Sequence, residues 1–66
     1  MKVGDLVNFT SPVHFFDDLG ENYWVTGTAL VLDTNEYDVT CLSAGAVLYS
    51  SWQEIGQEKE SIQYVT

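Results

Sequence analysis

Apolar and polar residues alternate along much of the chain, a pattern typical of β-strands that bury one face. The strongest pattern spans residues 26–42 and predicts a β-hairpin. Its first strand holds the continuous apolar run Ala29–Leu32, and its second strand, Tyr37–Leu42, alternates. The polar residues Asp33–Glu36 form the predicted turn between them. We expect the rest of the chain to wrap around this hairpin.

Three shorter patterns predict three more strands. Val3–Phe9 places most of its apolar side chains on one face, with Asp5 beside them as an acceptor for backbone hydrogen bonds. Residues 46–50 follow a tight turn at Ser43–Gly45, and residues 61–65 alternate.

A single helical turn is predicted before the last strand. Ser51 and Glu54 have the spacing of a capping box, in which the first residue caps the helix and the second lies three positions later. Gly56 is expected to stop the helix after one turn, which is typical of a 3₁₀ element.

Residues 10–25 have no clean period, and they are predicted to form a long connection with its tip at residues 17–22. Pro12 is expected to end the first strand or to lie at a sheet edge. The segment is nevertheless rich in large side chains, namely Val13, His14, Phe15, Phe16, Tyr23, Trp24 and Val25. Either it folds back over one open end of the sheet, or it presents an aromatic surface to a partner.

The apolar run of the hairpin implies cover on both faces. Leu30 and Leu32 point away from Ala29 and Val31, although an antiparallel strand with one solvated face should alternate with polar residues. If the chain's own aromatic segment covers the two leucines, the domain is a compact monomer. If another subunit covers them, the hairpin is an interface.

These elements predict an all-β fold, a small five-stranded SH3-like barrel with a long first loop and a one-turn 3₁₀ helix before the last strand. A chain of 66 residues suffices for one domain, 1–66. Such a small domain buries only roughly 60% of its unfolded surface, so partners or self-association often support it. Cys41, the only cysteine, is expected to be a buried core thiol.

The formal net charge of −8, from ten acidic and two basic side chains, argues against direct binding to nucleic-acid phosphates or anionic membranes. It permits a basic partner, mimicry of nucleic-acid charge, or simply a soluble surface. No apolar run approaches 18 residues, so no transmembrane helix is expected. The first residues enter a strand pattern at once, which argues against a signal peptide.

The candidate chemistry is sparse, and we expect no enzyme, no cofactor and no metal. His14 is the only histidine, and Ser50–Ser51 lacks the glycine-bounded elbow of a hydrolase. Residues 17–22 hold oxygen ligands and a glycine, the raw material of a calcium loop, but not the EF-hand spacing.

Nine aromatic residues exceed what so small a core can hide, and aromatic side chains are enriched in interface cores. Trp52 is expected to cap one end of the sheet. Six residues are the candidate partner-binding site: Phe15, Phe16, Tyr23, Trp24, Leu30 and Leu32.

Four stretches together resemble the small SH3-like barrel proteins encoded by tailed bacteriophages: Val3–Val7, Gly27–Asp33, Tyr37–Cys41 and Trp52–Ile55. Some small barrels of this kind are virion components. The resemblance therefore implies a structural protein of the virion, such as a decoration, cement or adaptor subunit, repeated in an assembly and docked on a larger protein. Its location would be the virion or the cytoplasm of an infected bacterial host.

The alternative hypothesis is a free acidic phage protein that inhibits a host nucleic-acid-binding or defence protein by charge mimicry. The carboxylates that would stand in for phosphates are Asp17, Asp18, Glu21, Asp33, Glu36 and Asp38. Such binding should be sensitive to salt, because charge interactions are screened beyond about 8 Å at physiological ionic strength.

Overall fold

The computed structural model describes residues 1–65; Thr66, the last residue of the predicted domain, lies outside the described residues. The fold is mostly β, as predicted, with five antiparallel strands, a short α-helix and one 3₁₀ turn. The elements follow in the order β1 (Leu6–Phe16), β2 (Asn22–Thr34), β3 (Asp38–Ser43), β4 (Ala46–Ser51), α1 (Trp52–Gln57), η1 (Lys59–Ser61) and β5 (Ile62–Tyr64).

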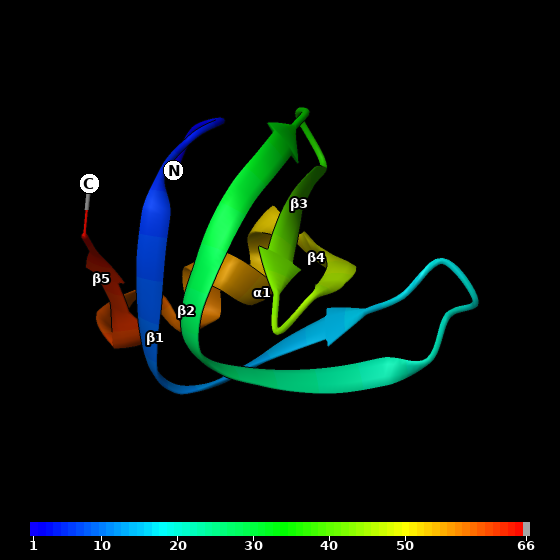
Figure 1. Ribbon diagram of the computed structural model, residues 1–66, viewed down its shortest axis with the longest axis horizontal. Coiled ribbons are helices and arrows are strands. Elements are labelled where there is room, and N and C mark those ends of the chain that lie inside the picture. Colours follow the sequence, from blue (N-terminus) through cyan, green and yellow to red (C-terminus); the bar gives the residue numbers. More distant parts are fainter. Residues whose placement is uncertain (66) are drawn as a thin grey trace.

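The strand pairing closes the sheet on itself. The order is β2-β3-β4-β1-β5, and β2 also pairs with β1. The pairing of β4 with β1, in which Phe16 lies opposite Tyr49, completes the closed sheet. β5 pairs with the start of β1 on the edge away from β2, with Val7 opposite Tyr64. Figure 1 shows the strands wrapped around a common interior, with β5 on the left.

The predicted long first loop is wrong. Residues 10–25 continue both strands of a hairpin, and only residues 17–21 connect them. Between Phe9 and Val13 the register shifts, so that three residues of β1 lie opposite the single residue Thr26 of β2. Such a bulge bends a strand pair, and Gly27 (φ 89°) permits the bend in β2. The bent end, residues 13–25, forms an arm that reaches to the right in Figure 1.

The core fills the interior with alternate residues of the strands. Its buried members are Val7, Phe9, Val13, Phe15, Val25, Ala29, Val31, Val39, Cys41, Leu48 and Ile55. The rings of Phe9 and Phe15 lie 5.7 Å apart between centroids. Cys41 is buried, as predicted. Because the arm contributes Val13, Phe15 and Val25, it is part of the folded core.

The helix begins where predicted but is longer. Ser51 caps it by accepting the backbone N–H of Glu54 (3.1 Å). The helix is α-helical through Gln57, so the predicted stop at Gly56 is wrong, and the 3₁₀ turn comes later at Lys59–Ser61. Trp52 packs against the core, and its indole N–H donates to the carbonyl of Asn35. Within residues 1–65 no helix is long and apolar enough to cross a membrane.

Candidate protein-binding surfaces

The six predicted partner-binding residues do not form one surface. Phe15 is fully buried in the core, so its assignment to a partner surface is wrong. Leu30 lies on the outer face of β2 between buried Ala29 and Val31, and exposed Leu32 follows Val31 where β2 and β3 shift register. The other three lie in the arm, where Phe16 and Trp24 face outward and Tyr23 lines a groove.

An apolar row crosses the outer face of four strands. Leu30 of β2 lies opposite Leu6 of β1 and opposite Leu42 of β3, and Leu42 lies opposite Val47 of β4. Each follows or precedes a buried residue, so these four side chains share the outer face. Val47 is 46% exposed. We call these four residues the apolar row.

The aromatic segment leaves Leu32, beside the apolar row, 38% exposed, whereas Leu30 is half-buried. Leu42 and Val47 were missed as surface candidates. Their signal was present in the sequence, since both are apolar at outward positions flanking the tight turn at residues 43–46.

An aromatic cluster occupies the outer face of the arm. The His14 ring lies 5.3 Å from Trp24 and 6.5 Å from Phe16, and Phe16 lies 6.2 Å from Tyr49, all between ring centroids. These four residues are the aromatic cluster. The indole of Trp24 is 69% exposed, so a large apolar face is available at the cluster.

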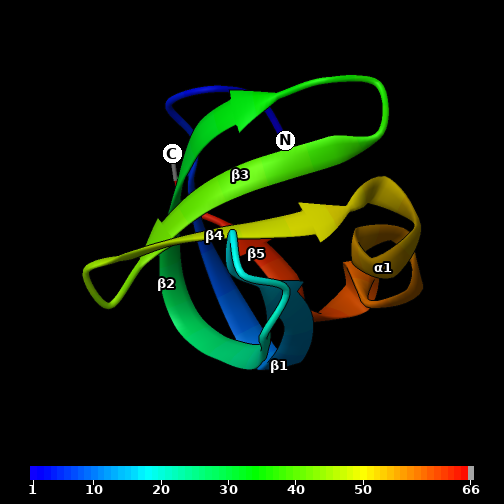
Figure 2. The same cartoon turned by 90° about the vertical axis from the view of Figure 1, so that its right-hand side faces the viewer.

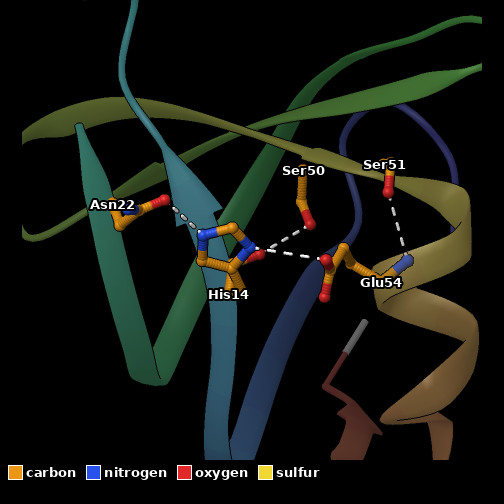
Figure 3. A network of polar contacts seen from close by, with 5 residues as sticks. All are labelled: His14, Asn22, Ser50, Ser51 and Glu54. Atoms are coloured by element: carbon orange, nitrogen blue, oxygen red, sulfur yellow. Dashed lines mark hydrogen bonds and ion pairs between the residues drawn. The ribbon is translucent and has the colours of Figure 1, made fainter. Parts of the chain in front are cut away.

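His14 is held by polar contacts on both ring nitrogens (Figure 3). Nε2 lies 2.7 Å from Oδ1 of Asn22, and Nδ1 lies 3.5 Å from Oε1 of Glu54 in α1. The hydroxyl of buried Ser50 donates to the backbone carbonyl of His14 (2.8 Å). A serine hydroxyl has one proton to donate, and that of Ser50 is used in this hydrogen bond between strands. The side chain therefore has a structural role.

A groove of about 320 Å³ lies between the arm and the β3–β4 turn. It is lined by Tyr23, Trp24, Val25 and Thr26 of β2 and by Ser43, Ala44, Ala46 and Leu48 of the β3–β4 hairpin. Most of these side chains are apolar or small. In Figure 1 the β3–β4 turn lies above the blue-green part of β2, and Figure 2 shows β3 and β4 side by side.

The loop that joins β1 to β2 is organised by Asp17. One carboxylate oxygen accepts the N–H groups of Leu19 and Glu21, and the other accepts the hydroxyl of Tyr23 (3.0 Å). The backbone donor of Glu21 is the main reason that the pKa of Asp17 is lowered. Hydrogen bonding to Asp17, with further repulsion from Glu21 and Asp18, raises the pKa of Tyr23. Tyr23 lines the groove, so the negative charges of Asp17, Asp18 and Glu21 act at this end of it.

The same contacts bear on the calcium-loop alternative, because both oxygens of Asp17 already serve the loop itself. Among residues 1–65, no group of three or more His, Cys, Asp and Glu side chains gathers in a way that could hold a metal ion. Burial raises the pKa of the Cys41 thiol to about 11, so this interior cysteine stays protonated at neutral pH.

A scan against protein-family models, a search of curated proteins and a search of solved structures each found no match to this chain.

Proposed function

We propose that this chain is a non-enzymatic binding subunit with the fold of a small SH3-like barrel, docked on a larger protein as a structural component of a phage particle. The order of elements supports the fold, since the closed sheet is followed by a short helix and a 3₁₀ turn before the last strand. The phage setting follows from the resemblance of the strand and hairpin motifs. The docking role follows from the surface.

The apolar row is the observation that carries this proposal. It places Leu30, Leu42 and Val47 side by side on three neighbouring strands of a chain whose formal net charge is −8. Contiguous exposed apolar patches on small proteins mark interaction sites. The exposed indole of Trp24 supplies a second anchor of the kind that dominates binding energy in protein interfaces.

The polar groups support a non-enzymatic role. Ser50 uses its proton to bind the backbone, and His14 contacts Asn22 and Glu54 beside an aromatic ring. No nucleophile lies in this set with a base placed to activate it, as covalent catalysis would require.

Mass spectrometry of purified particles tests the proposal, with the chain expected at a stoichiometric copy number. The double variant Leu42→Glu/Val47→Glu should be lost from particles, because it places two charges in the apolar row. Tyr37→Glu is the matched control, since Tyr37 is exposed on the β2–β3 turn away from that row, and it should be retained. Absence of the wild-type chain from particles rejects the proposal.

Charge mimicry is the second candidate, and one observation favours it. Its six acids fall in two groups at the ends of strands, with Asp17, Asp18 and Glu21 at the β1–β2 connection and Asp33, Glu36 and Asp38 around the β2–β3 turn. A pull-down from host lysate at low and high salt distinguishes the two. A partner released by salt supports mimicry, whereas one retained in salt supports docking through the apolar row.

A further inference from the structure

Within residues 1–65, β2 has an edge without a neighbouring strand along residues 22–27. Residues 22–27 of β2 pair with β1 on one side, whereas β3 begins to pair with β2 only at Leu30. In the described part of the chain no strand covers the other side of residues 22–27. An uncovered edge of this kind is a template for an additional strand.

The hydrogen-bond pattern shows which backbone groups point to that edge. The N–H of Asp17 donates to the carbonyl of Glu21, which closes the connection between β1 and β2. Antiparallel pairs alternate between hydrogen-bonded and non-bonded rungs, so Tyr23 and Val25 direct their backbone groups toward β1. The N–H and C=O groups of Asn22, Trp24 and Thr26 therefore point to the uncovered side.

The β3–β4 turn marks where this edge begins. The hydroxyl of Ser43 contacts the carbonyl of Thr28 at 3.5 Å, and the chain then turns back through Ala44 and Gly45. The space that β3 would have filled had it continued is the groove of about 320 Å³. The uncovered backbone and the groove are therefore parts of one site.

The side chains around the edge suit an extended chain with alternating residues. Val25 and Leu48 are buried, apolar and part of the groove lining, so they favour an apolar side chain on the inner face. Trp24 presents its exposed indole on the outer face, where it can pack against an arginine side chain by a cation–π contact. Asp17, Asp18 and Glu21 at the far end of the groove favour positive charge.

We propose that the uncovered edge of β2 binds an extended segment of a partner protein by β-strand addition, and that the segment alternates apolar with basic residues. A second copy of this chain does not fit, because two copies with a net charge of −8 repel each other. The inference rests on the proposed function only in that a partner protein exists. It names how a segment of that partner is bound and where.

A synthetic ten-residue peptide of alternating arginine and valine, blocked at both ends, is the probe. Titrated into ¹⁵N-labelled protein, it should shift the amide resonances of residues 22–26 and 43–48 and give contacts from its backbone protons to Trp24 and Thr26. Shifts confined to other strands would overturn the proposal.

Two N-methylated forms of the same peptide provide matched controls. Successive residues of a strand direct their N–H groups to opposite edges, so methylating every valine nitrogen blocks one edge and methylating every arginine nitrogen blocks the other. The two methylated peptides have the same charge, the same amino-acid composition and the same number of methyl groups. One form should bind at least tenfold more weakly than the other, whereas equal affinity means that only charge attraction is present and overturns strand addition.

A protein variant tests the same site from the other side. Thr26→Pro removes an N–H that points to the uncovered edge, a position at which strands tolerate proline. It should weaken binding at least tenfold, whereas Thr26→Val keeps the N–H and should bind as the wild type does. If Thr26→Pro fails to fold, the two N-methylated peptides still test strand addition on the wild-type protein. Leu42→Glu/Val47→Glu should still bind the peptide, so the inference and the proposed function fail separately.

Discussion

Asp5 is a buried carboxylate held by the start of the chain. It accepts the backbone N–H of Lys2 (2.9 Å), and the Lys2 ammonium lies 3.3 Å away. The backbone bond is the main cause of its lowered pKa, and burial opposes that effect. A lowered pKa adds stability above the unfolded value of 3.8, and this stability is lost as the pH falls through the folded value.

Asp5→Asn should therefore lower the melting temperature at pH 7 and should lose less stability on acidification than the wild type, so that the two curves converge as the pH falls through the folded pKa of Asp5. Thermal melts from pH 2.5 to 7 measure this. Lys2→Met keeps the backbone donor and should retain most of the pH dependence. A wild-type pH profile in Asp5→Asn would contradict the argument.

Ala44 carries backbone strain. It has φ 52° in the two-residue β3–β4 turn, followed by Gly45 at φ 78°. Positive φ at both positions defines a turn that favours asparagine over alanine at the first position. Ala44→Asn should stabilise the chain by about 0.5–1 kcal/mol, a few degrees in melting temperature. Ala46→Asn adds the same amide in the adjoining strand and should give no such gain in a thermal melt.

At the scale of elements, α1 depends on its cap. Its six residues are too few for a helix that is stable alone, and Ile55 is its only buried residue. The Ser51 hydroxyl satisfies the N–H of Glu54. Ser51→Ala should cost about 1 kcal/mol in denaturant unfolding, whereas Ser51→Thr keeps the oxygen and should cost much less. Equal losses in the two variants would mean that the cap does not stabilise the helix.

The strands predicted from the sequence were those with a clear local pattern, even though β2 and β3 shift register between Val31 and Asp33. The hairpin at residues 26–42 and the Ser51 cap were found because period and spacing are local signals. The arm was missed because the register shift at residues 10–12 interrupts the alternation of β1, and Pro12 suggested an end. Beyond the shift the period of two resumes, with Val13 and Phe15 inward and His14 and Phe16 outward.

The candidate surfaces depended on pairing that no local pattern contains. Leu30 and Leu32 were placed outward correctly by parity with Ala29 and Val31. Phe15 was misplaced because composition marks a segment as aromatic without saying which face each ring takes. The apolar row and the uncovered edge of β2 follow only from which strands lie side by side.

For the whole molecule, net charge is the dominant long-range term. Ten acidic side chains share a body with a radius of gyration of 10.4 Å. The Debye length is about 30 Å at 0.01 M salt and about 10 Å at 0.1 M, so most of these charges repel one another only at low salt. The melting temperature should rise between 0.01 and 0.5 M sodium chloride.

The double variant Glu36→Lys/Glu60→Lys is the control for this salt effect, because each exchange moves the net charge by two units toward zero. Both residues are exposed, so packing is left alone. The variant should melt higher than the wild type in 0.01 M salt and should gain less from added salt. A flat salt response in the wild type would show that local contacts compensate the repulsion.

The arm and the core share the same two strands without a break. Val13, Phe15 and Val25 fill the interior while the opposite faces of these strands form the arm's outer surface. A segment bound along the arm must therefore dissociate before the arm, and with it the core, can unfold. Occupancy at a hundredfold excess over Kd adds about 2.7 kcal/mol to unfolding. Its signature is slower digestion by protease along the entire chain.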